Sequence, residues 1–330
     1  MRTRHGRELK DMKEFKNIVV AGGGVLGSQI AFQAAYCGFN VTIWLRSEGS
    51  IGRTQPKLAH LKETYLSTIQ AMAAPDGKSK QIWACGIADY DDFDAEKCAA
   101  RVEAAAASIH LELDLAKAVE DADLLIESMA ENIDDKIAFY KKLAPVLPEK
   151  TLLVTNSSTL LPSKLAKYTG QPDRYLALHF ANSIWKNNTA EIMAQPETDG
   201  SAFDAIMDFA RQLRMVPLPV RKEKSGYLLN SMLVPFLFSA MDLYVNGVSD
   251  PESIDRAWTL GTGAPKGPFQ ILDTVGLTTA HNIVKQYVKI PRFLAPYNFR
   301  GMDAMLQKYL DAGKLGCAAG EGFYRYDNDK

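Results

Sequence analysis

Three glycines near the N-terminus have the spacing that nucleotide binding requires. Gly22, Gly24 and Gly27 form a Gly-x-Gly-x-x-Gly motif between the apolar run 18–21 and a helical pattern that begins at Val25. In such motifs the first glycine makes a tight turn, the second lets a pyrophosphate approach the backbone, and the third packs helix against strand. The phosphates would lie on the N–H groups that open the helix. The predicted dinucleotide contacts are Gly22, Gly24, Val25, Leu26 and Gly27.

The end of the next apolar run, 41–45 (VTIWL), is where such sites select their nicotinamide cofactor. A carboxylate there holds the ribose diol of NAD, whereas a nearby arginine accommodates the 2′-phosphate of NADP. Here Leu45 stands in the place of the acid, and Arg46 and Ser47 follow it. A surface arginine after a strand is the ordinary interpretation, but the missing carboxylate is a separate indication. We therefore expect NADP in preference to NAD, with NAD as the alternative.

His179 ends a further apolar run, 174–179 (RYLALH), and is a candidate for proton transfer. An imidazole titrates near neutral pH, so it can take a proton from an alcohol oxygen or return one. A lone histidine is more often structural, but ligands of open α/β sheets bind at the carboxyl ends of the strands. The four cysteines show neither metal-ligand spacing nor a disulfide framework, so no metal site is expected.

The elements that must position these residues alternate along the first two thirds of the chain. Strand-like runs recur at residues 18–21, 41–45, 123–128, 151–155, 174–179 and 216–220, and helical segments, including 135–147 and 203–213, separate them. This alternation predicts a Rossmann-type, doubly wound α/β domain with a mainly parallel sheet. The stretch 70–110 fits no simple crossover, and its alanine-rich part is interpreted as a helical insertion.

The pattern changes after Val220. A charged segment, RKEKSG, leads to helical patterns at residues 228–246, 250–260, 278–288 and 300–312, with no further strand-like runs. The expected division is therefore a solvated extension at residues 1–15, a dinucleotide-binding domain at 16–221, and an all-α substrate and dimerisation domain at 222–330.

Composition excludes several classes of protein. The 330 residues carry 38 Lys and Arg against 39 Asp and Glu, so no global basic field favours nucleic acid or an anionic membrane. The longest apolar stretches are about half of the length that crosses a bilayer. The charged N-terminus lacks the apolar segment of a secretory signal. We expect a cytoplasmic protein without nucleic-acid or membrane partners.

Several longer stretches resemble the 3-hydroxyacyl-CoA dehydrogenase family, most of all its diketoreductase branch. They are VLGSQIAFQ, TNSSTLLPS, LALHFAN, NNTAEIM, GYLLNSMLVP, GTGAPKGPF and GEGFYRY. The resemblance implies an oxidoreductase that transfers a hydride between a nicotinamide cofactor and the 3-carbon of a small-molecule 3-hydroxy or 3-oxo acid, ester or acyl thioester. A true NAD-dependent 3-hydroxyacyl-CoA dehydrogenase is one alternative, and a non-catalytic dinucleotide-binding or structural protein is another.

The resemblance places the family's catalytic residues on four positions, each of which keeps the family's residue type. Its histidine falls on His179, its partner glutamate on Glu191, its substrate-contacting serine on Ser158 and its domain-junction asparagine on Asn230. The carboxylate would fix the tautomer of the imidazole. Ser158 and Asn230 would donate hydrogen bonds to the reacting oxygen, where charge develops. The complete set disfavours a non-catalytic role.

Further cofactor contacts are implied in the same way. Glu131, Lys136, Asn156 and Asn182 match the family's cofactor-side positions, and Ser183 stands where the family usually has a proline. For Glu131 and Lys136, an ordinary charged helix N-terminus is the alternative. The helical domain usually makes the dimer in this family, so we expect a homodimer.

One departure concerns the substrate. The family's CoA-binding serine and lysine fall on Leu61 and Thr68, and neither residue can hold a phosphate. This favours a smaller 3-oxo or 3-hydroxy acid or ester over an acyl-CoA.

Overall fold

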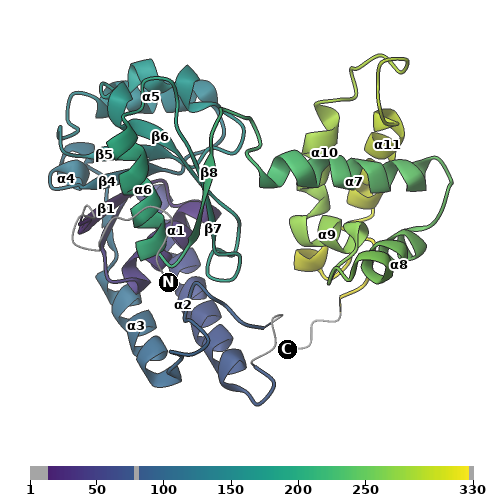
Figure 1. Ribbon diagram of the computed structural model, residues 1–330, viewed down its shortest axis with the longest axis horizontal. Helices are drawn as coiled ribbons and strands as arrows, with labels where there is room; N and C mark the ends of the chain where they lie inside the picture. The colour runs from purple at the N-terminus through teal and green to yellow at the C-terminus, as the bar shows by residue number, and fades with distance from the viewer. Residues whose placement is uncertain (1–13, 78–81, 327–330) are drawn as a thin grey trace. The chain divides into compact units, whose positions relative to one another are not determined.

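The computed structural model describes residues 14–77 and 82–326, and the chain forms two compact units (Figure 1). Unit 1 ends at Leu228, and unit 2 begins at Leu229. Each unit has a hydrophobic core of its own.

Unit 1 is built on an eight-stranded sheet with the order β3-β2-β1-β4-β5-β6-β7-β8. Its strands are β1 Asn17–Ala21, β2 Asn40–Trp44, β3 His110–Glu112, β4 Leu124–Glu127, β5 Leu152–Thr155, β6 Tyr175–Phe180, β7 Thr189–Met193 and β8 Val216–Val220. Neighbouring strands run parallel, except that β6 and β7 are antiparallel. The order reverses at β1, and ligands of doubly wound sheets bind at such a switch point.

Helices cover both faces of this sheet, which explains why its central strands are continuous apolar runs. One hydrophobic cluster lies beneath α1, α2, α3 and α6, and another lies beneath α4 and α5. The helices are α1 Val25–Tyr36, α2 Glu48–Ala73, α3 Ala95–Ser108, α4 Leu115–Val119, α5 Ile133–Leu143 and α6 Gly200–Gln212, with 3-10 turns at Pro162–Lys164, Ala166–Tyr168 and Pro172–Arg174. The prediction of a doubly wound, mainly parallel sheet is confirmed.

The stretch 70–110 is part of a crossover rather than a separate insertion. Helix α2 extends to Ala73 and pairs with α3, and Figure 1 shows the two helices side by side. Together they connect β2 to β3 at the edge of the sheet. The prediction of helix in the alanine-rich part was right, but a crossover made of two long helices has no simple sequence pattern.

The boundary between the units lies seven residues after the expected one, at 228 instead of 221. Residues 222–228 belong to unit 1 because Tyr227 packs in a buried cluster with residues of β6 and β7. At the other end, most of the expected extension 1–15 lies outside the described residues. Phe15, which is described, is buried against Phe209 of α6.

Unit 2 is helical, as predicted. It contains α7 Leu229–Val245, α8 Pro251–Thr262, α9 Pro268–Val275, α10 Leu277–Lys285, α11 Phe299–Asp311 and a 3-10 turn at Cys317–Ala319. Helix α9 was not predicted because it has only eight residues between two glycine-containing turns. Asp255 of α8 explains its position, since this buried carboxylate accepts hydrogen bonds from the backbone N–H groups of Phe269 and Gln270.

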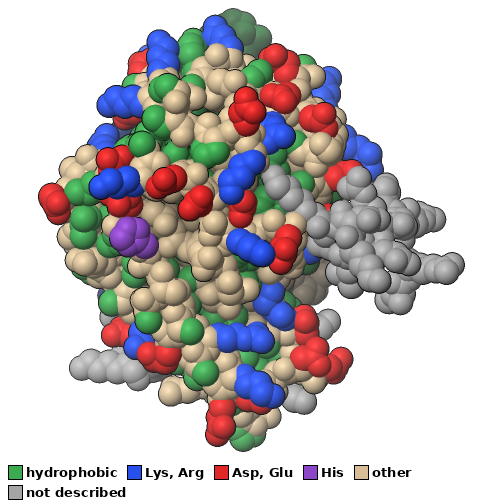
Figure 2. Space-filling model, turned by 90° about the vertical axis from the view of Figure 1, so that its left-hand side faces the viewer, with side chains coloured by type: hydrophobic (Ala, Val, Ile, Leu, Met, Phe, Trp, Pro, Cys, Tyr) green, Lys and Arg blue, Asp and Glu red, His purple; other side chains and the backbone are tan. Residues whose placement is uncertain are grey.

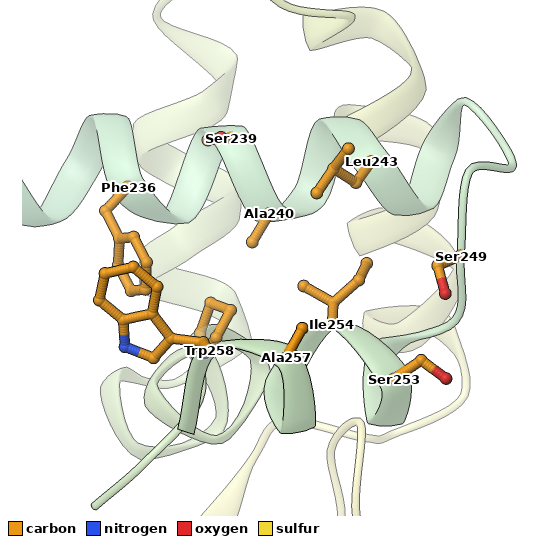
Figure 3. Close-up of a pocket in the computed structure, with 10 residues that line it drawn as sticks. Phe236, Ser239, Ala240, Leu243, Ser249, Ser253, Ile254, Ala257 and Trp258 are labelled. Carbon is orange, nitrogen blue, oxygen red and sulfur yellow. The ribbon is translucent and has the colours of Figure 1, made fainter. Parts of the chain in front are cut away.

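A cavity of about 460 Å³ lies between α7 and α8 within unit 2 (Figure 3). Phe236 and Trp258 lie together at one end, and Ser249 and Ser253 lie at the other. The middle is apolar.

The described surface and helices bear on the expected partners. On the face of the molecule in Figure 2, cationic and acidic side chains are interspersed rather than gathered into a field of one sign. Within residues 14–77 and 82–326, every helix is too short or too polar to cross a bilayer. In the same residues, no three His, Cys, Asp or Glu side chains gather as metal ligands would.

Candidate active site

The glycine turn between β1 and α1 has the geometry of a phosphate cradle. Gly22 has φ +117°, and a Cβ built there would lie 2.6 Å from the carbonyl oxygen of Ser128. A Cβ on Gly27 would lie 2.1 Å from the carbonyl oxygen of Gly22, so both positions require glycine. A Cβ on Gly24 meets no described atom within 4 Å, so this position faces open space at the start of α1. A pyrophosphate fits there.

A cavity of about 230 Å³ adjoins this turn and extends towards the end of β2. Three cationic side chains line it, Arg46 after β2 and Arg53 and Lys57 in α2, together with one acid, Asp135. Ser47, which was also predicted to contact the cofactor, is not among its lining residues, and its hydroxyl lies 3.0 Å from that of Ser50. The other lining residues are Gly22, Gly23, Gly24, Trp44, Leu45, Ser50, Thr54, Ser128, Met129 and Ala130.

His179 lies in β6 directly opposite Glu191 in β7. The antiparallel register pairs the two residues, so their side chains emerge on the same face of the sheet. His179 Nδ1 lies 2.9 Å from Glu191 Oε2, and both residues are buried, with 5% and 3% of their surface exposed. A carboxylate only accepts hydrogen bonds, so Nδ1 carries the proton and Nε2 is the basic nitrogen of the neutral ring.

Ser158 completes this arrangement from the loop after β5. Its Oγ lies 3.1 Å from His179 Nε2. The second oxygen of Glu191, Oε1, accepts a hydrogen bond of 2.8 Å from the backbone N–H of Leu228. Three of the four predicted catalytic residues therefore form one connected chain. The fourth, Asn230, lies in the first turn of α7 in unit 2, and its role remains a prediction.

Glu131 holds the loop that carries Ser158. Its Oε1 accepts hydrogen bonds from the Ser157 hydroxyl at 2.6 Å and from the Thr159 backbone and hydroxyl at 2.8 and 2.7 Å. Burial by itself raises the pKa of Glu131, but these hydrogen bonds and the charge of Lys136 bring the pKa below its usual value. Glu131 is therefore ionised at neutral pH and fixes the loop.

Lys136 differs from the prediction that it contacts the cofactor. Only 1% of its side chain is exposed, and its Nζ lies 2.5 Å from Glu127 Oε1 and 3.8 Å from Glu131 Oε2. Glu127 is also fully buried and accepts hydrogen bonds from Tyr140 and Thr155. A buried charge requires such partners, so Lys136 supports Glu131 from inside the protein instead of facing a ligand.

Two asparagines, Asn156 and Asn182, were predicted to contact the cofactor. Asn156 joins neighbouring strand ends, since its Oδ1 accepts from the Phe180 N–H at 3.1 Å. Asn182 is exposed in the loop after β6. The next residue, Ser183, has φ +58°, and its N–H donates to Gln29 Oε1 of α1 at 2.8 Å. Proline has φ near −65° and no N–H, so this loop cannot adopt its observed shape with the family's usual residue.

Sequence reasoning missed Tyr227, whose ring stacks on that of His179 with centroids 4.5 Å apart and planes 12° apart. The stretch GYLLNSM had drawn attention only to Asn230. It missed Glu127 as well, although a glutamate that ends an apolar strand is an unusual feature and was a usable signal.

Comparisons with known proteins agree with this geometry. Residues 17–224 match the family model described as 3-hydroxyacyl-CoA dehydrogenase, NAD binding domain, and residues 226–326 match the model of its C-terminal domain. The human mitochondrial hydroxyacyl-coenzyme A dehydrogenase is 31% identical over 311 residues, which cover 94% of this chain and 91% of the relative.

Two further relatives extend the comparison. A probable 3-hydroxybutyryl-CoA dehydrogenase of Bacillus subtilis (strain 168) is 28% identical over 317 residues, covering 95% of this chain and 98% of the relative. A solved diketoreductase structure, described as showing dual catalysis of dicarbonyl compounds, is 44% identical with a TM-score of 0.80. That match covers 96% of this chain and 100% of the diketoreductase.

Proposed function

Because the chain belongs to the 3-hydroxyacyl-CoA dehydrogenase family, we propose that its substrate is a small 3-oxo or 3-hydroxy acid or ester and that His179 and Glu191 are its acid/base pair. The predicted resemblance and enzyme class are confirmed: this is an oxidoreductase that acts on CH–OH groups of small molecules with a nicotinamide cofactor. The observation that carries the proposal is the connected chain Ser158–His179–Glu191.

We propose a step for each of these residues. The nicotinamide cofactor supplies the hydride for the 3-carbon in reduction, or accepts it in oxidation, when it is bound. In reduction His179 gives a proton from Nε2 to the oxygen, and in oxidation Nε2 takes that proton. Glu191 holds the ring and stabilises its protonated form. Ser158 donates a hydrogen bond to the same oxygen while charge develops on it.

A substrate without coenzyme A is supported by the two positions that replace the family's CoA-binding residues. Leu61 is buried in the hydrophobic core of unit 1. The hydroxyl of Thr68 donates to the Thr64 carbonyl within α2. The nearby Lys62 forms an ion pair of 2.7 Å with Glu103 of α3. None of these three side chains is arranged to hold a nucleotide phosphate.

The substrate class is tested by following absorbance at 340 nm during reduction of a 3,5-diketo ester and of acetoacetyl-CoA. We expect kcat/KM to be at least ~10-fold higher for the diketo ester than for acetoacetyl-CoA. The reason is that the residues at the family's CoA-binding positions provide no binding energy for the CoA moiety. A preference for acetoacetyl-CoA would assign the protein to the true acyl-CoA dehydrogenases.

The proposal includes NADP as the preferred cofactor. Arg46, Arg53 and Lys57 line the same cavity as the glycine turn. Among the described residues none of the three forms an ion pair with a carboxylate, so their charges are available to a 2′-phosphate. An arginine–phosphate contact is worth about 1.5–3 kcal/mol. This corresponds to roughly ten- to a hundredfold in affinity.

Leu45→Asp combined with Arg46→Ile is expected to reverse this preference, because the acid binds the ribose diol and repels the 2′-phosphate. Fluorescence titration of NADH and NADPH measures both affinities at moderate salt. Arg300→Ile, which removes an exposed arginine in unit 2, is the matched control. Tighter binding of NADH than NADPH by the unmodified protein would contradict the proposal.

A homodimer through unit 2 is also part of the proposal. Met232, Trp258 and Leu260 are exposed apolar side chains of α7 and α8, and Trp258 lines the apolar cavity of Figure 3. Exposed apolar surface of this kind favours association. Sedimentation velocity is expected to give twice the mass of the chain at micromolar concentration, and a monomer under those conditions would refute this part.

The cytoplasmic location stays a prediction, and the human relative is mitochondrial.

A further inference from the structure

The ring of Tyr227 stacks face to face on the imidazole of His179. The centroids are 4.5 Å apart and the planes differ by 12°, and 1% of Tyr227 is exposed. The hydrogen bonds at Nδ1 and Nε2 hold the edge of the imidazole towards Glu191 and Ser158. Edge contacts alone leave the ring free to tilt about the line that joins them. A flat contact on its face removes that freedom.

The three residues 226–228 contact the three members of the catalytic chain one by one. The Gly226 N–H donates to the Ser158 carbonyl at 3.2 Å. The Tyr227 ring stacks on His179, and the Leu228 N–H donates to Glu191 Oε1 at 2.8 Å. This segment therefore joins a loop after β5 to side chains on β6 and β7.

The backbone of Tyr227 is itself held in an uncommon conformation. Its φ is +50°, in the left-handed region that residues with a Cβ rarely adopt. Such residues persist where surrounding contacts enforce them, and they concentrate at active sites. Here the hydroxyl donates to the Ser157 carbonyl at 2.7 Å, and the N–H donates to the Lys224 carbonyl at 3.1 Å.

The phenol is a neutral hydrogen-bond donor. Burial, followed by the nearby charges of Glu131 and Glu191, raises the pKa of Tyr227 well above its usual value. The hydroxyl therefore keeps its proton for the Ser157 carbonyl and does not compete as an acid. The electron-rich face of the ring favours the imidazolium that forms when His179 accepts a proton.

We propose that Tyr227 is a positioning residue for proton transfer, which fixes the plane of the His179 ring so that Nε2 faces the reacting oxygen. It acts through the stack, whereas its hydroxyl anchors the ring on the loop of Ser158. The proposal rests on the proton-transfer role proposed for His179.

Tyr227→Leu removes the stack and is expected to lower kcat by about 10- to 100-fold, because a misplaced proton-transfer group costs this much. KM for the substrate and Kd for NADPH should change by less than about threefold, since neither involves transition-state positioning. Tyr227→Phe keeps the aromatic face and is expected to retain kcat within about fivefold. If Tyr227→Leu does not fold, Tyr227→Met tests the loss of the stack with a similar side-chain volume.

The matched control is Tyr36→Leu. Tyr36 is another buried tyrosine of unit 1, and its hydroxyl donates to the Ile87 carbonyl at 3.1 Å. This variant should lower the melting temperature and leave kcat within about twofold, because it removes a similar packing contact away from His179. An equal loss of kcat in Tyr36→Leu and Tyr227→Leu would show that Tyr227 contributes only to stability, and the proposed positioning role would be wrong.

A double variant separates this inference from the proposed function. In a His179→Gln background, Tyr227→Leu should cause no further loss, because residues that act as a unit are not additive. Additive losses would overturn the role of Tyr227 and leave that of His179 intact. If His179→Gln itself kept its activity, the proposed acid/base pair would be wrong, and the inference about Tyr227 would fall with it.

Discussion

Replacing His179 with glutamine is expected to lower kcat by about two to four orders of magnitude, because the variant has no group that exchanges a proton at this position. Glutamine can keep a hydrogen bond to Glu191 or Ser158, but it cannot act as an acid or base near neutral pH. The affinity for NADPH should remain nearly unchanged, since the glycine turn and its cavity lie elsewhere on the sheet edge. Steady-state kinetics and fluorescence titration measure the two quantities.

The chain offers a closely matched control for this substitution. His281 of α10 is also buried and pairs with a carboxylate, with Nε2 lying 2.8 Å from Asp303 Oδ1 of α11. His281→Gln removes an equivalent pair within unit 2 and is expected to affect stability more than kcat. Retention of more than about a tenth of the activity by His179→Gln would rule out the proton-transfer role.

Glu191→Gln is expected to lower kcat by a similar two to four orders of magnitude, as in other histidine–carboxylate pairs that lose the acid. The amide can donate to Nδ1, which places the proton on Nε2 and leaves the wrong nitrogen basic. The double variant with His179→Gln should be little worse than His179→Gln alone, because the pair acts as a unit.

The measurement is a double-mutant cycle on kcat, with Asp303→Asn as the matched amide control in unit 2. Its expected effect on kcat is less than about threefold. If the losses from His179→Gln and Glu191→Gln simply multiplied in the double variant, the two residues would work independently and the proposed pair would be disproved.

The fold was predictable wherever the sequence has strong periodicity. Buried parallel strands such as 151–155 and 174–179 are continuous apolar runs. In unit 2, α8, α10 and α11 show clear amphipathic patterns, and α7 is a long apolar run. The glycine turn was predictable because Gly22 and Gly27 leave no room for a Cβ, whereas Gly24 leaves open space where a pyrophosphate could approach the backbone. By contrast, β3 is only three residues long, and the five residues of β7 include a charged glutamate, Glu191. Runs this short carry no recognisable period.

The catalytic residues of the site were predictable from the sequence, but the buried residues that hold them in place were not. His179, Glu191 and Ser158 came from the family resemblance, and the structure brings them within hydrogen-bond distance. Lys136 had the sequence position of a surface lysine, yet it is buried on Glu127. Tyr227 is an aromatic residue in an apolar stretch, which sequence cannot distinguish from a core residue. Both depend on contacts between distant segments that no local pattern records.

The antiparallel pairing of β6 and β7 limits how the loop between them can vary. Side chains alternate between the two faces of a strand, so a slip of one residue would move Glu191 to the face opposite His179. Residues 181–188 can therefore be exchanged for loops of other lengths only if the new loop returns the chain in the same alignment. A graft that changes this alignment would keep every catalytic residue in the sequence and yield an inactive enzyme.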